Sequence, residues 1–127
     1  MNKPYDIRER AFEYACAAVL AYPAQRMDGR TQRIWLQFIS AATSGGAHLE
    51  EADAASSRIH FITLNRGALR EFREAKYWIR VINSTKLPGW ETAPPLISES
   101  GELVAIVTAI VKKASSNLSS KKRQPGN

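Results

Sequence analysis

The chain has 127 residues, of which 44% are apolar and 24% charged, a composition that is typical of a globular domain rather than a fibrous or disordered protein. A chain of this length has room for one core, so we expect a single domain. The formal net charge of +6, from 18 Lys and Arg against 12 Asp and Glu, permits binding to nucleic acid or another polyanion without requiring it.

The cysteine content and the N-terminus indicate a cellular compartment. The chain has one cysteine, Cys16, which excludes an intramolecular disulfide and a multi-cysteine metal cage. Residues 1–6 lack the apolar core of a signal peptide, and no run approaches the roughly 18 apolar residues that a membrane span requires. We therefore expect a cytoplasmic protein that is neither exported nor embedded in a membrane.

Three breaks, at residues 23–29, 52–56 and 87–95, divide the sequence into four segments. Within the segments, apolar residues recur at steps of three and four, and no strand-like alternation stands out. Four amphipathic helices joined by short connections pack most simply as a bundle. The predicted fold is therefore all-α, an antiparallel up-down four-helix bundle.

The first predicted helix, at about residues 6–22, is apolar nearly all round. One face carries Ile7, Ala11, Tyr14, Ala18 and Tyr22, and the other positions include Phe12, Cys16, Val19 and Leu20. A helix with this pattern usually has neighbours on more than one side, which in a short chain indicates a subunit interface and a homo-oligomer. Because Cys16 lies among apolar residues, we expect its thiol to be buried and inert.

The second predicted helix, at about residues 30–52, has small residues at its centre. Its apolar stripe consists of Ile34, Phe38, Ala41, Gly45, Leu49 and Ala52. The two glycines, Gly45 and Gly46, each cost about 1 kcal/mol relative to alanine in a helix. We expect close approach of another backbone to be the reason for them.

The third predicted helix, at about residues 57–83, is the clearest of the four. Its start can be capped by Ser56 or Ser57. Its apolar seam consists of Phe61, Leu64, Ala68, Phe72, Ala75, Ile79 and Ile82.

The fourth predicted helix, at about residues 98–117, begins at Ser98 as its cap, with Glu99 and Glu102 in its first turn. Its apolar residues are Leu103, Ile106, Val107, Ile110, Val111 and Ala114. After the bundle, at residues 1–118, a polar stretch at residues 119–127 has a composition that cannot build a core. We predict that this stretch is a disordered basic tail.

A row of basic residues follows the face of the third helix opposite its seam. It consists of Arg66, Arg70, Arg73, Tyr77 and Arg80, at steps of four, three, four and three. Arginine binds phosphate bidentately and tyrosine stacks on a base, so this basic stripe suits single-stranded or duplex nucleic acid. A solvated outer face is the competing interpretation, because Glu74 lies one turn from Arg70.

No catalytic or metal-binding constellation stands out in the sequence. His48 and His60 are separated by twelve residues, which matches no metal-ligand spacing. Glu50, Glu51 and Asp53 near His48 form a possible acid–base cluster, but such charges are common at a helix end and in a loop. We therefore expect no enzyme activity, no metal and no cofactor.

The sequence resembles a known family over about residues 5–114. The matching residues include Tyr5-Asp6-Ile7, Ala42-Thr43-Ser44, Glu51-Ala52, Ser57, Ala68-Leu69-Arg70-Glu71 and Tyr77-Trp78. This pattern resembles the small four-helix bundle proteins encoded in intervening sequences of bacterial large-subunit (23S) ribosomal RNA genes. The resemblance implies an up-down bundle that assembles into rings, as pentamers, without known catalytic activity. A related group, the accessory variability proteins of diversity-generating retroelements, binds nucleic acid and a reverse transcriptase.

Two hypotheses follow for the function. In the first, the protein is a homo-oligomer, a pentamer by the resemblance, that binds RNA or DNA as an adaptor through the basic stripe. In the second, it is a scaffold whose basic surface contacts an acidic protein or a nucleic-acid-processing enzyme, such as a reverse transcriptase, without touching nucleic acid. Binding of nucleic acid by the purified protein, and the dependence of that binding on salt, separates the two.

Overall fold

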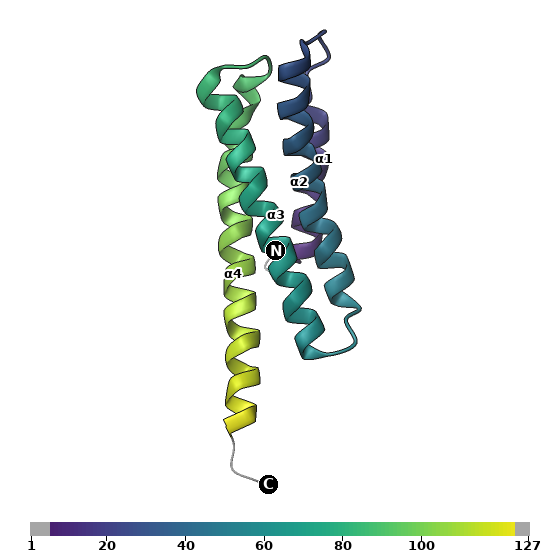
Figure 1. Cartoon of the computed structure of the whole chain (residues 1–127), viewed down its shortest axis with the longest axis vertical. Helices are drawn as coiled ribbons and strands as arrows, with labels where there is room; N and C mark the ends of the chain where they lie inside the picture. The colour runs from purple at the N-terminus through teal and green to yellow at the C-terminus, as the bar shows by residue number, and fades with distance from the viewer. Residues whose placement is uncertain (1–5, 124–127) are drawn as a thin grey trace.

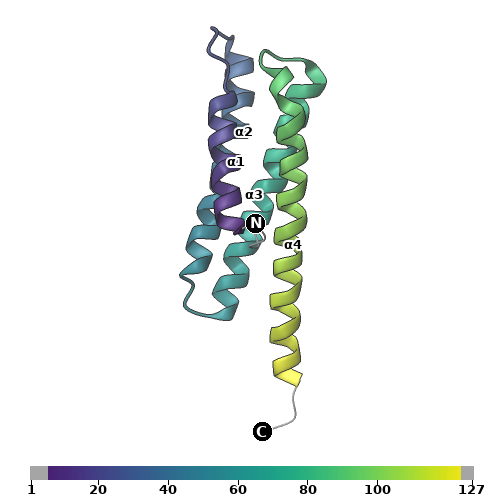
Figure 2. The same ribbon diagram turned by 180° about the vertical axis from the view of Figure 1, so that it is seen from behind.

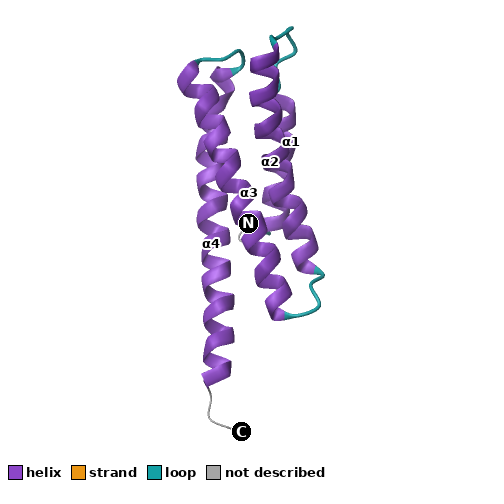
Figure 3. Cartoon of the chain, in the orientation of Figure 1, coloured by secondary structure: helices purple, strands orange, loops and turns teal. Residues whose placement is uncertain are grey.

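The chain folds into four long helices arranged as an up-down bundle (Figures 1 and 3). The computed structural model describes residues 6–123, with side chains to residue 118. The elements are α1 (Ile7–Ala21), α2 (Gly29–Asp53), α3 (Arg58–Thr85), the one-turn helix η1 (Trp90–Thr92) and α4 (Ala93–Arg123). Residues 6–123 contain no strand. The predicted all-α four-helix architecture is confirmed.

Helix α3 lies at the centre of the packing. It contacts both α2 and α4 along most of its length, and α1 packs chiefly against α2. Contacts between α1 and α4 are sparse, so the bundle is open on that side. The view from behind shows α1 and α4 with their long axes side by side (Figure 2).

Side-chain caps fix the starts of the first three helices. The carboxylates of Asp6 and Asp28 accept hydrogen bonds from the backbone N–H groups of Arg8 and Thr31, at 2.9 and 2.8 Å. The hydrogen bonds from the Arg8 guanidinium and the Arg8 backbone N–H lower the pKa of the Asp6 carboxyl group, and the hydrogen bonds from Thr31 lower the pKa of Asp28. Ser57 caps α3 by accepting from the N–H of His60 at 3.0 Å, so of the two predicted caps Ser57 is the one used.

Aromatic rings fill the centre of the core. Tyr14, Trp35, Phe38 and Phe72 are each at most 2% exposed and meet in edge-to-face contacts at 5.9–6.4 Å between ring centroids. The hydroxyl of Tyr14 is hydrogen-bonded to Ser100 Oγ at 2.5 Å, and Ser100 donates to the Leu96 carbonyl. Burial raises the pKa of Tyr14 to about 12, so this phenol is neutral at physiological pH and links α1 to α4 as a hydrogen-bonding group.

The buried faces of α2 and α3 differ in part from the predicted seams. At the start of α3, Ile62 and Asn65 are buried, whereas the predicted Phe61 and Leu64 are half-buried. In α2, Trp35 takes the fully buried position that we predicted for Ile34. Because α3 packs between two helices, its buried arc is wider than a single seam and includes residues on both flanks.

Helix α4 is longer than predicted at both ends. It begins at Ala93, so the predicted cap Ser98 lies inside the helix. Pro94 and Pro95 occupy its first turn, where a missing N–H costs no helical hydrogen bond. At the other end the helix continues to Arg123, so residues 119–123 belong to it rather than to a disordered tail, and residues 124–127 lie outside the described part. This end of α4 extends past the α2–α3 loop (Figure 1).

Helix α1 leaves much of its apolar surface exposed. Phe12 is 60% exposed, Val19 50% and Leu20 83%. Cys16 is also exposed, so the predicted burial of its thiol is wrong. The cause is that α1 has protein neighbours on one side only, and Cys16 lies on the other side.

Among the described helices, the segment Trp90–Leu118 meets the length and composition of a membrane span. No such segment was expected from the sequence. Less than a quarter of its apolar window is buried within the chain. The buried residues, which include Leu96, Leu103, Val107 and Ala114, face the bundle. Pro95 and Leu96 of α4 line a groove with α1 on the open side of the bundle.

Candidate nucleic-acid interface

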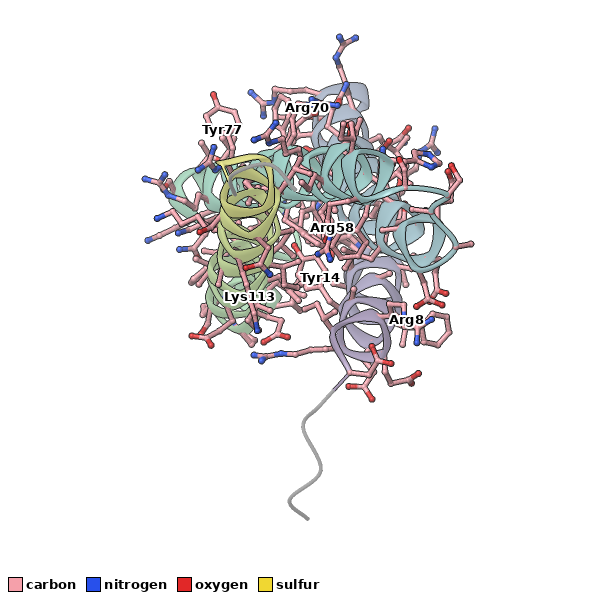
Figure 4. The ribbon with its side chains drawn as sticks, turned by 90° about the horizontal axis from the view of Figure 1, so that it is seen from below. Arg8, Tyr14, Arg58, Arg70, Tyr77 and Lys113 are labelled. Atoms are coloured by element: carbon pink, nitrogen blue, oxygen red, sulfur yellow. The ribbon has the colours of Figure 1, made fainter. Side chains whose placement is uncertain are left out.

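The basic stripe lies on the outward face of α3. Arg66, Arg70, Arg73, Tyr77 and Arg80 are all exposed. Steps of three and four place them in one row, which extends about 21 Å from end to end at about 1.5 Å per residue. In the view along the bundle, Arg70 and Tyr77 project from the side opposite to Arg8, with Tyr14 between the helices (Figure 4).

The arginines of the stripe are not neutralised by carboxylates. The ion pairs of the described side chains join Arg8 to Asp6 and Asp53, Arg10 to Glu99 and Glu102, and Arg30 to Asp28. None of them includes an arginine of the stripe. Glu74, one turn from Arg70, forms no ion pair with it within residues 6–118. The guanidinium groups of the stripe therefore keep their donors available for phosphate oxygens.

Tyr77 has a defined aromatic neighbour that sequence analysis did not assign to the site. Its ring is 57% exposed and contacts Trp78 edge to face, with centroids 5.2 Å apart and planes at 76°. Trp78 is half-buried and packs against the core. The Tyr77 ring is thus exposed to solvent, and it rests against Trp78, which the core holds in place.

One lysine, Lys76, lies at the α3–α4 boundary close to the basic stripe. Lys76 is half-buried beside α4, where a Cβ atom on Gly101 would lie 3.6 Å from its Nζ. Lys112 and Lys113 are exposed on α4. In the sequence, the position of Lys76 three residues after Arg73 was the feature that could have added it to the candidate site. Its proximity to α4 depends on packing that the sequence alone does not define.

The two histidines and the nearby acidic residues do not form a common site. His48 Nδ1 is 2.8 Å from the Ser44 carbonyl, and its ring lies against Gly67 of α3. His60 is beside Ser56 at the α2–α3 loop, and Asp53 pairs with Arg8. Over the described part of the chain, no three His, Cys, Asp or Glu side chains gather closely enough to hold a metal ion.

An open groove of about 860 Å³ lies between α1 and the start of α4. At one side, Arg10 and Glu99 form a bidentate pair at 2.6 and 2.9 Å. The apolar lining comes from both helices. It consists of Tyr14, Ala17, Leu20, Ala21, Pro95 and Leu96. The groove is therefore an apolar surface on the side of the molecule away from the basic stripe.

The fold and the surface define the class of protein: a four-helix bundle with a basic face on α3 and an apolar face on α1 and α4. No protein-family model matches the chain, and no curated protein matches it in sequence. The chain is similar to a solved structure, a protein of unknown function from the S23 ribosomal protein family of Bacteroides thetaiotaomicron. The TM-score is 0.74 and the identity 26%, over 84% of this chain and 99% of that chain. The predicted link to intervening sequences and to retroelement proteins stays a prediction.

Proposed function

We propose that this protein is a non-catalytic, cytoplasmic, homo-oligomeric four-helix bundle that binds nucleic acid through the basic stripe on α3. The observation that carries the proposal is the row of four exposed arginines without carboxylate partners, all on one helix face and interrupted by an exposed tyrosine. Among the other arginines whose side chains are described, Arg8, Arg10 and Arg30 pair with carboxylates, whereas Arg26, Arg33 and Arg58 form no ion pair. The stripe differs from these unpaired arginines in that its four arginines lie in one row on one helix face, which supports a role in contacting a partner outside the chain.

The chemistry of the stripe suits a phosphate backbone. Each arginine has a planar fork of donors that matches two phosphate oxygens, and it stays charged at every physiological pH. The length of the stripe, about 21 Å, equals the rise of about six nucleotides along one strand of a duplex at about 3.4 Å each. One chain therefore offers a few phosphate contacts, which by themselves give weak and salt-sensitive binding.

Self-association would strengthen this binding. A ring or other closed assembly repeats the stripe, so that one polymeric ligand meets several copies at high effective concentration. The exposed apolar residues of α1 and the α1–α4 groove offer a surface for such an assembly. They lie away from the stripe, so assembly through them leaves the arginines accessible.

The experiment is a charge reversal with a matched control. The double substitution Arg70→Glu with Arg73→Glu is compared with Arg26→Glu and Arg33→Glu, which change the net charge equally at exposed arginines outside the stripe. We expect the stripe variant to bind a 20-nucleotide RNA or DNA at least tenfold more weakly at 50 mM salt, and the control variant to lose much less. The slope of log affinity against log salt should become less steep by about 0.7–0.9 per lost phosphate contact.

Circular dichroism and light scattering accompany the titration, because both variants should keep wild-type helicity and mass. Equal losses in the two variants would mean that net charge alone is responsible. If the wild-type protein binds no nucleic acid at 50 mM salt, the stripe is not a nucleic-acid site. The scaffold that contacts an acidic protein or a nucleic-acid-processing enzyme then becomes the better explanation.

A further inference from the structure

We propose that the stripe selects strands with unpaired bases, because Tyr77 serves as a stacking platform for one base between two phosphate-binding arginines. The inference rests on the proposed function and deepens it, since it names single-stranded nucleic acid as the ligand.

The ring geometry leaves a face of Tyr77 open. In an edge-to-face pair one ring contacts the other with its edge, so Trp78 covers at most one face of the tyrosine. The 57% exposure of Tyr77 agrees with an open face. Because Trp78 packs against the core, it restricts the Tyr77 ring. The side chain therefore loses less conformational entropy when a base stacks on it.

Tyr77 lies between two arginines of the stripe that are about 10.5 Å apart along the helix, the length of about three nucleotides at about 3.4 Å each. Arg73 precedes it by four residues and Arg80 follows it by three, so the two guanidinium groups flank the ring at about one helical turn on each side. A strand whose phosphates contact both arginines therefore passes over the tyrosine. A base that leaves the strand at this point can lie on the ring face.

A duplex cannot use the platform in this way. Its base faces are stacked on one another, and opening a base pair costs a few kcal/mol. The arginines can contact the phosphates of a duplex and of a single strand alike, whereas the tyrosine can stack only on the unpaired bases of a single strand. Selectivity thus resides in the one aromatic side chain of the stripe.

The contact with Trp78 is the one ring contact that Tyr77 makes within the described residues. Its hydroxyl forms no hydrogen bond with the described residues, and more than half of its surface is outside the core. A tyrosine that only stabilised α3 would be expected to bury its ring or to satisfy its hydroxyl.

The test separates bases from phosphates. Wild-type protein is titrated with a dT 20-mer and with an abasic 20-mer, which carries the same phosphates and no bases. We expect wild type to bind the dT strand at least fivefold more tightly than the abasic strand, because stacking of a single base on an aromatic ring contributes at least that much affinity. Tyr77→Ala should abolish this preference without changing affinity for the abasic strand, and Tyr77→Phe should preserve it.

A matched control is Ile59→Ala, which removes an apolar side chain of 59% exposure from the same helix. It should leave the preference for the dT strand unchanged. If wild type binds the two strands equally, or if Tyr77→Ala retains the preference, the platform is excluded while binding by the arginines stands. If wild type binds neither strand, both the platform and the proposed function are wrong.

Discussion

The adjacent glycines of α2, Gly45 and Gly46, have different roles because they face different neighbours. A Cβ atom on Gly45 would overlap the ring of Phe72, which is fully buried and cannot move aside. A Cβ on Gly46 would lie 3.5 Å from the Ala11 Cβ, an ordinary contact. Close packing therefore accounts for Gly45, although its neighbour is the Phe72 side chain rather than the second backbone that we predicted.

This difference predicts opposite effects of the same substitution. Gly45→Ala should lower the free energy of unfolding, because overpacking costs about 1–3 kcal/mol and exceeds the gain of up to about 1 kcal/mol in helix propensity. Gly46→Ala should raise it by up to about 1 kcal/mol, since the propensity gain is not opposed. Thermal unfolding at one protein concentration measures both, and a stabilising Gly45→Ala would contradict the packing shown here.

At the scale of elements, the exposed face of α1 predicts self-association. Leu20 is 83% exposed and lines the groove towards α4, so Leu20→Glu would place a charge in the proposed interface. We expect wild type to have several times the 14.1 kDa chain mass, about 70 kDa for a pentamer. The variant should dissociate towards the monomer.

Leu36→Glu provides the control for this experiment, because Leu36 is 54% exposed on the outer face of α2. Light scattering coupled to size exclusion should find its mass unchanged. A monomeric wild-type protein at micromolar concentration would contradict the oligomer. If only the Leu36 variant dissociates, the subunit interface lies on α2 and not on α1.

The elements also show which features the sequence could predict. Each helix was found from apolar spacing within its own segment, and the stripe was placed correctly on an exposed face because one helix defines it. The start of α4 was missed because Pro94 and Pro95 read as a break, although a first turn tolerates proline. The exposure of Cys16 and the position of Lys76 beside α4 were missed because they depend on which helices are neighbours. Local spacing carries no such information.

For the whole molecule, the structure has two distinct surfaces. The basic stripe on α3 and the apolar face of α1 and α4 lie on different sides of the bundle, so the proposed oligomer contact and the proposed nucleic-acid contact do not compete for the same surface (Figure 4). Positive charge is also present at Lys121, Lys122 and Arg123, near the end of α4, and this charge could bind nucleic acid without the stripe. A decisive measurement must therefore locate the contact and not only detect it.

Photo-crosslinking to a single-stranded RNA that contains 4-thiouridine provides that location. After irradiation at 50 mM salt, trypsin cuts behind Lys76 and Arg80 and releases residues 77–80 as one peptide, which mass spectrometry identifies with its attached nucleotide. The account predicts that this peptide carries the principal crosslink and that the crosslink is lost in Arg70→Glu with Arg73→Glu. Crosslinks confined to residues 119–127 or to α1 and α2, with residues 77–80 unmodified, would contradict it.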